Sequence, residues 1–280
     1  MNKASLTLKK NALLTAAFLF WAVLGPSPAL WAQSDEELAG QNAVLDNARG
    51  ENWRVSLGLG LMSAPEFEGS DKNEAKFVPV IDVRYGRFFL SGAQGLGFEA
   101  VSTRDWTLAP SLKYRQGRDQ DDSDLLRGLG DVDGGAELGA VLSWHPSDLA
   151  FFLGAYHGLG RARGLTAELG ALYSTPLSEK LRATLGASLM LADSDYNQAY
   201  FGISREQSLR SGYRAYEADG GLKHVAVSAS LAYELAYDLN LGFFAEYKRL
   251  VGPAADSPLV ERGSEKQFSG GLSLGFKFGQ

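Results

Sequence analysis

The sequence predicts an all-β protein, a transmembrane antiparallel β-barrel of about twelve strands that follows a cleaved signal peptide. Three observations lead to this prediction. The last segment of the chain alternates apolar and polar residues almost to its end. The first segment has the order of a secretory leader. The same alternation recurs throughout the residues between them.

The C-terminal stretch 267–278 has one apolar and one polar face. Its apolar members share one parity: Phe268, Leu272, Leu274, Phe276 and Phe278. Side chains alternate between the two faces of a strand, so such a segment turns its apolar residues to one side. An outer-membrane barrel closes with a strand of this kind, which places its apolar face toward lipid. The alternative for this segment alone is the edge strand of a soluble sandwich.

The N-terminal residues predict export. Lys9 and Lys10 precede the apolar run 12–24, and small residues then lead to a cleavage site after Ala32 or Ala29. This is the order of a secretory signal peptide. No later segment reaches the roughly 18 apolar residues that a spanning helix needs. We therefore expect a signal peptide at 1–32, a loose periplasmic arm at 33–51 and the barrel at 52–280.

Composition narrows the functional classes. The 280 residues include no cysteine, so disulfides and thiol chemistry are excluded. Removal of the leader with Lys3, Lys9 and Lys10 changes the formal charge from −6 to −9. This acidic balance argues against nucleic acid as a partner. No cofactor is predicted.

The alternation identifies the strands in order. Clear segments lie at 55–61, 76–85, 106–115, 137–144, 165–174, 181–191, 224–235, 241–248 and 267–278. Residues 149–157 are apolar on both parities, so their facing stays open. Residues 87–100 must hold two further strands with a tip near 92–95 if short and long connections are to alternate, and the strand at 87–91 is short. The total is then even, with both chain ends in the periplasm.

Connection lengths support the same arrangement. Tight links are expected at 85–87, 102–105, 145–148, 176–180 and 237–240, and long links at 63–75, 116–133, 193–221 and 252–265. Barrels of this type have short periplasmic turns and long external loops. Residues 160–164 then form a second short external tip. Aromatic residues cluster at the strand ends, where an interfacial girdle belongs: Trp53, Tyr85, Trp106, Trp144, Tyr173, Tyr233, Tyr237 and Phe278.

The polar parity predicts a charged lumen. Its candidate members are Lys76, Asp82, Arg84, Lys113, Arg115, Glu137, Glu168, Arg182, Glu234, Glu246, Lys248 and Lys277. Two alternatives stay open. The charges pair across the interior and close it, because an unpaired buried charge is costly, or water fills a small pore that they tune. The loops at 116–133 and 193–221 are candidates for inward-folded plugs.

Catalytic and metal-binding motifs are weak. His224 and Ser228 share a face, but strand alternation produces such pairs by chance. The segment 131–134 is similar to part of a calcium-binding loop but lacks its full ligand spacing. The simpler interpretation is a solvated external loop. The alternative is weak contact with divalent ions at the lipopolysaccharide surface. We expect no enzyme and no metal site.

Nine short motifs, taken in order and spacing, resemble the MltA-interacting protein family, also called MipA/OmpV. They are 64–70 (APEFEGS), 78–80 (VPV), 84–90 (RYGRFFL), 95–97 (GLG), 199–204 (AYFGIS), 211–216 (SGYRAY), 220–223 (GGLK), 255–260 (ADSPLV) and 276–278 (FKF). The chain departs from many barrels because Gly279 and Gln280 follow its last aromatic residue.

The resemblance implies an outer-membrane protein without catalytic residues. The best-described member looks like a scaffold that joins a lytic murein transglycosylase to a bifunctional penicillin-binding protein during cell-wall growth. Other members look like surface antigens, adhesins or porin-like proteins. The expected partners are therefore outer-membrane lipid, lipopolysaccharide and those murein enzymes. The candidate loop motif comprises Tyr200, Phe201, Gly202, Ser211, Gly212 and Tyr216. The simpler interpretation is that these residues only shape the loops and their turns.

Overall fold

The computed structural model describes residues 53–279 apart from residue 162. The predicted signal peptide and the arm at 33–51 lie outside the described residues. Within the described part of the chain, no helix combines the length and the apolarity that a transmembrane span requires.

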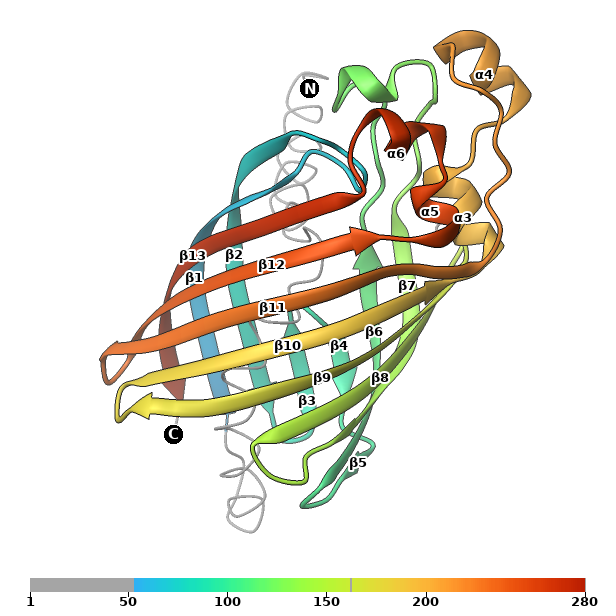
Figure 1. The fold of residues 1–280 in the computed structure, drawn as a ribbon. Helices are drawn as coiled ribbons and strands as arrows, with labels where there is room; N and C mark the ends of the chain where they lie inside the picture. Colours follow the sequence, from blue (N-terminus) through green and yellow to red (C-terminus); the bar gives the residue numbers. More distant parts are fainter. Residues whose placement is uncertain (1–52, 162, 280) are drawn as a thin grey trace, which may run out of the picture.

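The described strands form one antiparallel sheet that closes on itself as a barrel (Figure 1). They are β1 (Trp53–Pro65), β2 (Asn73–Tyr85), β3 (Phe88–Ser91), β4 (Gly95–Phe98), β5 (Val101–Ser102), β6 (Trp106–Arg115), β7 (Gly135–Trp144), β8 (Leu149–Gly158), β9 (Leu165–Ser178), β10 (Leu181–Ala192), β11 (Gly221–Ala236), β12 (Leu239–Leu250) and β13 (Lys266–Gly279). β4 and β5 both pair with β6 and act as one interrupted strand, so the predicted number of twelve is confirmed.

The first and last strands close the wall. β13 pairs with β1 from Gly279 opposite Arg54 to Gly270 opposite Ser63, and β12 flanks its other side. A Cβ on Gly58 would collide with the carbonyl oxygen of Leu274 across this pair, which explains a glycine in the middle of a strand.

The two ends of the barrel differ. The tight turns predicted from the sequence gather at one end, here called the turn end. The helices gather at the other, the loop end (Figure 1). They are a 3₁₀ turn η1 (Asp124–Leu126), α3 (Ser194–Phe201), α4 (Arg205–Ser211), α5 (Gly252–Ala255) and α6 (Pro258–Arg262). The first long loop is only 66–72, because β1 and β2 extend beyond the predicted strands.

The loops of the loop end pack into one cap with its own core. One cluster contains Phe201 of α3 with Leu250 and Val260. A second contains Phe67 and Leu126, together with Ile203 and Tyr213 on either side of α4. Phe201 and Leu126 are completely buried. Four loops far apart in sequence therefore form an ordered body rather than separate arms.

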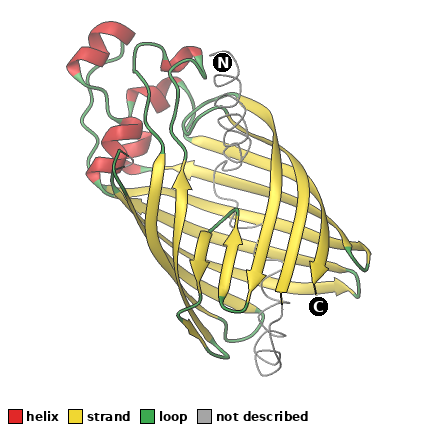
Figure 2. Ribbon diagram, turned by 180° about the vertical axis from the view of Figure 1, so that it is seen from behind, coloured by secondary structure: helices red, strands yellow, loops and turns green. Residues whose placement is uncertain are grey.

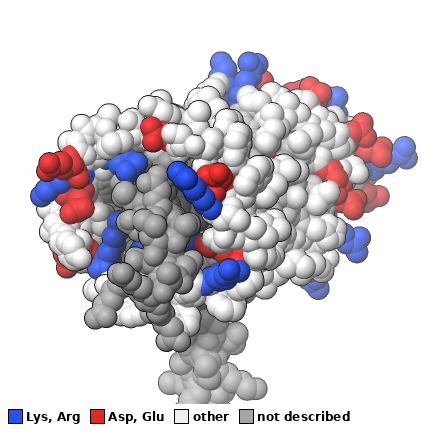
Figure 3. All heavy atoms as spheres, turned by 90° about the horizontal axis from the view of Figure 1, so that it is seen from below, with Lys and Arg blue, Asp and Glu red and all other residues white. Residues whose placement is uncertain are grey.

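The outer wall is apolar and the inner wall polar. Leu59 is 66% exposed on the outside, whereas Ser56 on the opposite parity is buried at 8%. The sequence did not decide which side chains of 149–157 face outward. In β8, Leu153 faces outward with 49% exposure and Tyr156 faces inward with 7% exposure. Figure 3 shows charged side chains gathered on the left and at the right-hand edge of the view from below, with an uncharged surface between them.

Aromatic side chains ring the turn end, as predicted. Trp106 and Trp144 lie opposite each other on β6 and β7, and their rings stack at 5.8 Å. Phe151 on β8 continues the row at 5.5 Å from Trp144. Trp53 faces Tyr85 in the same way on β1 and β2. Amphipathic rings at one end of an apolar wall form the girdle of a membrane interface.

Replacement of Leu59 by arginine tests the lipid-facing wall. We expect Leu59→Arg to destabilise the barrel in vesicles by about 2–4 kcal/mol, because the guanidinium would enter hydrocarbon. The matched control is Leu209→Arg on α4, where the leucine is 88% exposed on the cap. Urea unfolding followed by heat-modifiable gel mobility measures both. Equal, small effects would contradict a lipid-facing Leu59.

Candidate functional site

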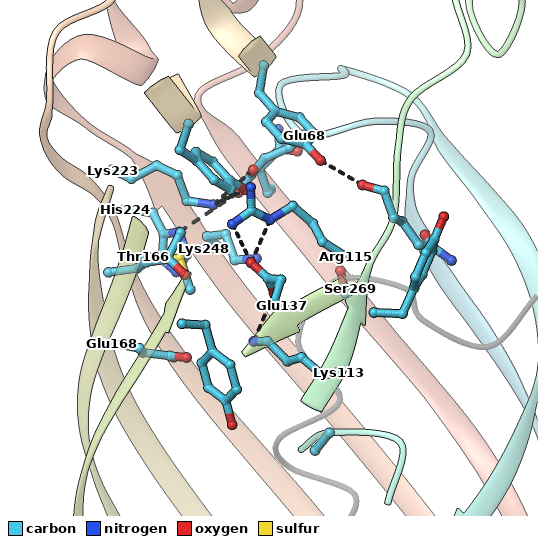
Figure 4. A pocket seen from close by; sticks show the side chains of 18 of the residues that line it. Glu68, Lys113, Arg115, Glu137, Thr166, Glu168, Lys223, His224, Lys248 and Ser269 are labelled. Carbon is cyan, nitrogen blue, oxygen red and sulfur yellow. Dashed lines mark hydrogen bonds and ion pairs between the residues drawn. The ribbon is translucent and has the colours of Figure 1, made fainter. Parts of the chain in front are cut away.

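A cavity of about 340 Å³ lies inside the barrel beneath the cap (Figure 4). Strands from around the wall and three loops of the cap contribute to it. The predicted lumen charges that line it are Lys76, Lys113, Arg115, Glu137, Glu168, Glu246 and Lys248. Alternation along the strands thus brings residues far apart in sequence to one interior space.

The other predicted lumen charges lie elsewhere. On β2, Arg84 pairs with Glu99 at 3.0 Å and approaches Asp82 at 3.9 Å. Arg182 and Lys277 lie on β10 and β13 toward the turn end, and Glu234 is exposed beside the β11–β12 turn. These residues do not join the cavity.

Arg115 and Glu137 form the centre of the charged lining. Arg115 Nε donates to Glu137 Oε1 at 2.6 Å, and its Nη2 pairs with the same carboxylate. Its Nη1 donates to the carbonyl oxygen of Arg163 at 2.6 Å. Both side chains are buried, and two guanidinium nitrogens contact the same oxygen, Glu137 Oε1. The low local dielectric and the charge-assisted hydrogen bond strengthen this pair.

Lys113 shares Glu137 with Arg115. Its ammonium lies 3.5 Å from Glu137 Oε2 and 3.7 Å above the ring of Tyr156. The Tyr156 hydroxyl is in turn hydrogen-bonded to Ser111 at 2.9 Å. Two cations therefore meet one carboxylate here, and the aromatic face stabilises the second cation.

A second ion pair joins the cap to the barrel wall. Lys223 Nζ lies 3.0 Å from both carboxylate oxygens of Glu68 and donates to the Tyr196 hydroxyl at 3.1 Å. Glu68 comes from the loop 66–72, Lys223 from β11 and Tyr196 from α3. Figure 4 shows Glu68 and Lys223 converging from opposite sides.

A β-bulge explains why Lys223 points inward. The β10–β11 register shifts between Met190 and Leu191, so Lys223 is an extra residue in its strand. Lys223 and His224 are then both buried, which strict alternation would forbid. Periodicity alone therefore missed Lys223, and it missed Glu68 because that residue lies in a predicted loop. Both residues lie in segments that carry the family resemblance, Glu68 in 64–70 and Lys223 in 220–223, so this resemblance was the sequence feature that could have indicated them.

Gln267 holds the Glu68 loop in place. Its side-chain oxygen accepts from the Gly69 N–H at 3.1 Å, and its amide nitrogen donates to the carbonyl oxygens of Ser70 and Ser264 at 3.1 and 2.7 Å. The polar parity of β13 thus anchors a loop that is remote in sequence.

Electrostatics at the cap follow from this pairing. Burial raises the pKa of Glu68, but the ammonium groups of Lys223 and Lys248 lower it more, so its net pKa lies below the ordinary value. Burial, together with the negative charge of Glu68, holds the pKa of Tyr196 well above its usual range. Glu68 is therefore the ionised partner and Tyr196 a neutral hydrogen-bonding group.

The candidate loop motif has structural roles in the cap. Gly202 ends α3, and Gly212 ends α4 with a φ of 77°, a conformation that favours glycine. Tyr200 donates to the Gln116 carbonyl oxygen at 2.6 Å, and Tyr216 donates to that of Pro253 at 2.8 Å. Ser211 donates back to the Gln207 carbonyl oxygen at 2.7 Å. With the buried Phe201, these residues hold the loops together.

The weak chemical motifs do not assemble into a site. His224 Nδ1 lies 3.8 Å from Glu68 Oε1 and has no hydrogen-bond partner among the described residues. In the acidic loop, carboxylates of Asp119 and Asp131 accept from backbone N–H groups of Asp121 and Gln120. Within the described part of the chain, no group of three or more His, Asp or Glu is arranged to hold a metal ion.

A family model and a known relative match this chain along most of its length. Residues 57–278 match the family model described as MltA-interacting protein MipA. The MltA-interacting protein of Escherichia coli (strain K12) is 27% identical over 248 residues, which cover 86% of this chain and 95% of that protein. The putative outer membrane protein YiaT of the same strain is 28% identical over 119 residues, or 42% of this chain and 47% of that protein.

A solved porin has a similar outline. The NanC porin is 12% identical, covers 80% of this chain and 100% of its own, and gives a TM-score of 0.42. The localisation is supported independently by the closed barrel with its apolar outer wall and by the outer-membrane relative. The protein is an outer-membrane β-barrel.

Removal of the Glu68 charge tests the link between cap and wall. We expect Glu68→Gln to destabilise the protein by about 3 kcal/mol, because it leaves the Lys223 ammonium buried without its counter-ion. The matched control is Glu265→Gln, whose pair with Arg249 is largely exposed, and it should cost about 0–1 kcal/mol. The midpoint of heat-modifiable mobility measures both. Equal costs would contradict the proposed coupling.

The same pair predicts an acid dependence. Because the folded pKa of Glu68 is lower than its ordinary value of 4.5, its stabilising effect is complete above that value and is lost as the pH falls through the folded pKa. The stability difference between the unsubstituted protein and Glu68→Gln should therefore be constant near neutral pH and shrink in acid below pH 4.5. A difference that does not change with pH would show that charge is not its cause.

Proposed function

The chain belongs to the MltA-interacting protein MipA family, and from this premise we propose that it is a non-enzymatic scaffold in the outer membrane. In this proposal the barrel holds a lytic transglycosylase and, in the same complex, a penicillin-binding protein, and so links murein degradation to murein synthesis. The observation that carries the proposal is the family match over residues 57–278 together with the name of the Escherichia coli relative.

The interior supports a binding role better than a catalytic one. The charged side chains of the interior bond to one another and to the backbone: Arg115 bonds to Glu137 and to the Arg163 carbonyl oxygen, and Lys223 bonds to Glu68. A catalytic acid or base needs a free path to a substrate proton. The charges instead stabilise the barrel and fasten its cap, and the outside remains available for partners.

The turn end is the expected docking surface for murein enzymes. Barrels of this type place their short turns in the periplasm, where murein lies. Tyr237 projects from the β11–β12 turn with 96% exposure. Exposed tyrosines are frequent anchors of protein interfaces, because they bury a large area at small entropic cost. The periplasmic arm predicted at 33–51 is the second expected contact.

The alternative function is a channel for small solutes or, if the cap binds ligands at the cell surface, an adhesin. The observation that favours a channel is the cavity of about 340 Å³, whose lining contains both signs of charge. The observation against it is the pairing of those charges. The two functions differ in whether the lumen conducts ions.

Affinity capture tests the scaffold and the end that it uses. Detergent-extracted full-length protein should recover a lytic transglycosylase from envelope extract, and Tyr237→Ala should lower that recovery several-fold through loss of an interfacial anchor. Leu209→Ala, at a site on the cap that is also strongly exposed, is the matched control and should leave recovery unchanged. The proposal would be wrong if the folded barrel recovered neither murein enzyme. If only Leu209→Ala lowered the recovery, the docking surface would lie on the cap.

A further inference from the structure

The outward parity of the described strands carries full charge in one place, and both charges there are positive. They belong to Arg249 near the end of β12 and Lys266 at the start of β13, and both residues are exposed. The two residues are register partners, so they lie directly opposite each other on neighbouring strands. We call Arg249 and Lys266 the rim pair. On an outer wall that is otherwise uncharged, two adjacent cations mark a specific position.

The rim pair lies where the apolar wall meets the cap. The next outward residues on the same strands are Tyr247 and Phe268, which are also exposed register partners. Two residues along a strand span about 7 Å, so the rim pair lies one layer beyond these rings. Figure 2 shows the helices of the cap beyond this end of the strands. Barrels of this type turn their long loops to the outside of the cell, which places the rim pair at the surface of the outer leaflet.

The rim pair has more positive charge than its own carboxylate can balance. Like charges directly opposite each other on one face of a sheet repel, so an anion between them is favoured. Glu265 Oε1 lies 2.9 Å from Arg249 Nη2, but the two side chains are 39% and 52% exposed, so this pair is weak. Lys266 has no ion-pair partner among the described residues. Two cations and one carboxylate leave room for a further anion.

The wall beneath the rim pair is shaped in two layers. Tyr247 and Phe268 form a bulky layer, and the next outward partners toward the middle of the membrane are Ala245 and Gly270. Ala229 of β11 is the partner of Ala245 on the other side, so the layer of small residues spans three strands. Small residues let a hydrocarbon chain approach the backbone, and the rings above them add dispersion contacts along its upper part.

We propose that the rim pair binds a phosphate group of lipopolysaccharide, the phosphorylated glycolipid of the outer leaflet. The phosphate lies between the Arg249 guanidinium and the Lys266 ammonium, and the acyl chains run down the wall past Tyr247 and Phe268. One phosphate has enough anionic oxygens to accept charge-assisted hydrogen bonds from both cations. A soluble anion would match only the charges, and an uncharged lipid would match only the apolar wall. This site goes beyond the scaffold role and does not depend on it.

Native mass spectrometry of the full-length protein, refolded in detergent, tests the site with bis-phosphorylated lipid A as the probe. We expect Arg249→Gln and Lys266→Gln each to weaken binding about fivefold, because each removes one exposed charge contact. Arg249→Lys and Lys266→Arg should retain binding. The matched control is Arg214→Gln, since Arg214 is 60% exposed and pairs with Glu261 at 2.9 Å on the cap, and it should leave binding unchanged. Heat-modifiable mobility confirms that each variant is folded.

Glu265 gives a test with the opposite sign. Its carboxylate competes with the phosphate for Arg249, so Glu265→Gln should strengthen lipid A binding about threefold. Weaker binding by Glu265→Gln would contradict an anion at the rim pair.

Two further probes separate the phosphate from the acyl chains. Dephosphorylated lipid A should bind about tenfold more weakly, and inorganic phosphate at millimolar concentration should not displace lipid A. Equal binding by every variant, or by both forms of lipid A, would overturn the proposal, because it would indicate only lipid spread around the barrel. Displacement by inorganic phosphate would also overturn it and would leave a site for soluble anions. None of these results involves capture of a transglycosylase, so this site and the scaffold role fail separately.

Discussion

The structure depends on one constraint: in hydrocarbon, every backbone N–H and C=O group must find its partner within the protein. Pairing of β13 with both β1 and β12 closes the sheet and removes the edges that would otherwise face lipid. Closure then fixes the side chains, because alternation turns apolar residues outward and polar residues inward. Pairing is shortest between β2 and β6, where β3 and β4 each pair with only part of their long neighbour. The charged interior and the cap are consequences of the same arrangement.

An interior of this size has little room for solvated charge, so its ionic groups are held in pairs. Arg115 and Glu137 pair across neighbouring strands, while Lys223 draws Glu68 inward from a loop. The inward carboxylate explains why the cap is ordered: the loop that supplies it also provides Phe67 to the cap core. Stability of the barrel and order of the cap are thereby coupled. A rigid, capped barrel suits a platform that presents its ends to partners.

The sequence predicted whatever depends on local alternation. The strands, the tight turns and the aromatic girdle follow from parity and connection lengths, and the structure confirms them. Parity also identified several of the charged residues that line the cavity. Contacts between distant segments could not be predicted in this way. Lys223 points inward through a bulge, and Glu68 is drawn from a loop by a partner 155 residues away. The facing of Phe152 was undetermined because both parities of its segment are apolar, and only pairing with β7 and β9 decides it. The signal peptide and the arm at 33–51 stay predictions.

We infer that paired charges close the lumen, so that the barrel serves as a platform and not as a pore. Single-channel conductance of the refolded mature chain in a planar bilayer is the first test of this claim. We expect a folded, heat-modifiable barrel that is electrically silent, and a leak that appears when Arg115→Gln breaks the Arg115–Glu137 pair. Steady conductance by the unsubstituted protein, altered in ion selectivity when Glu168 is neutralised, would contradict the claim and favour a channel.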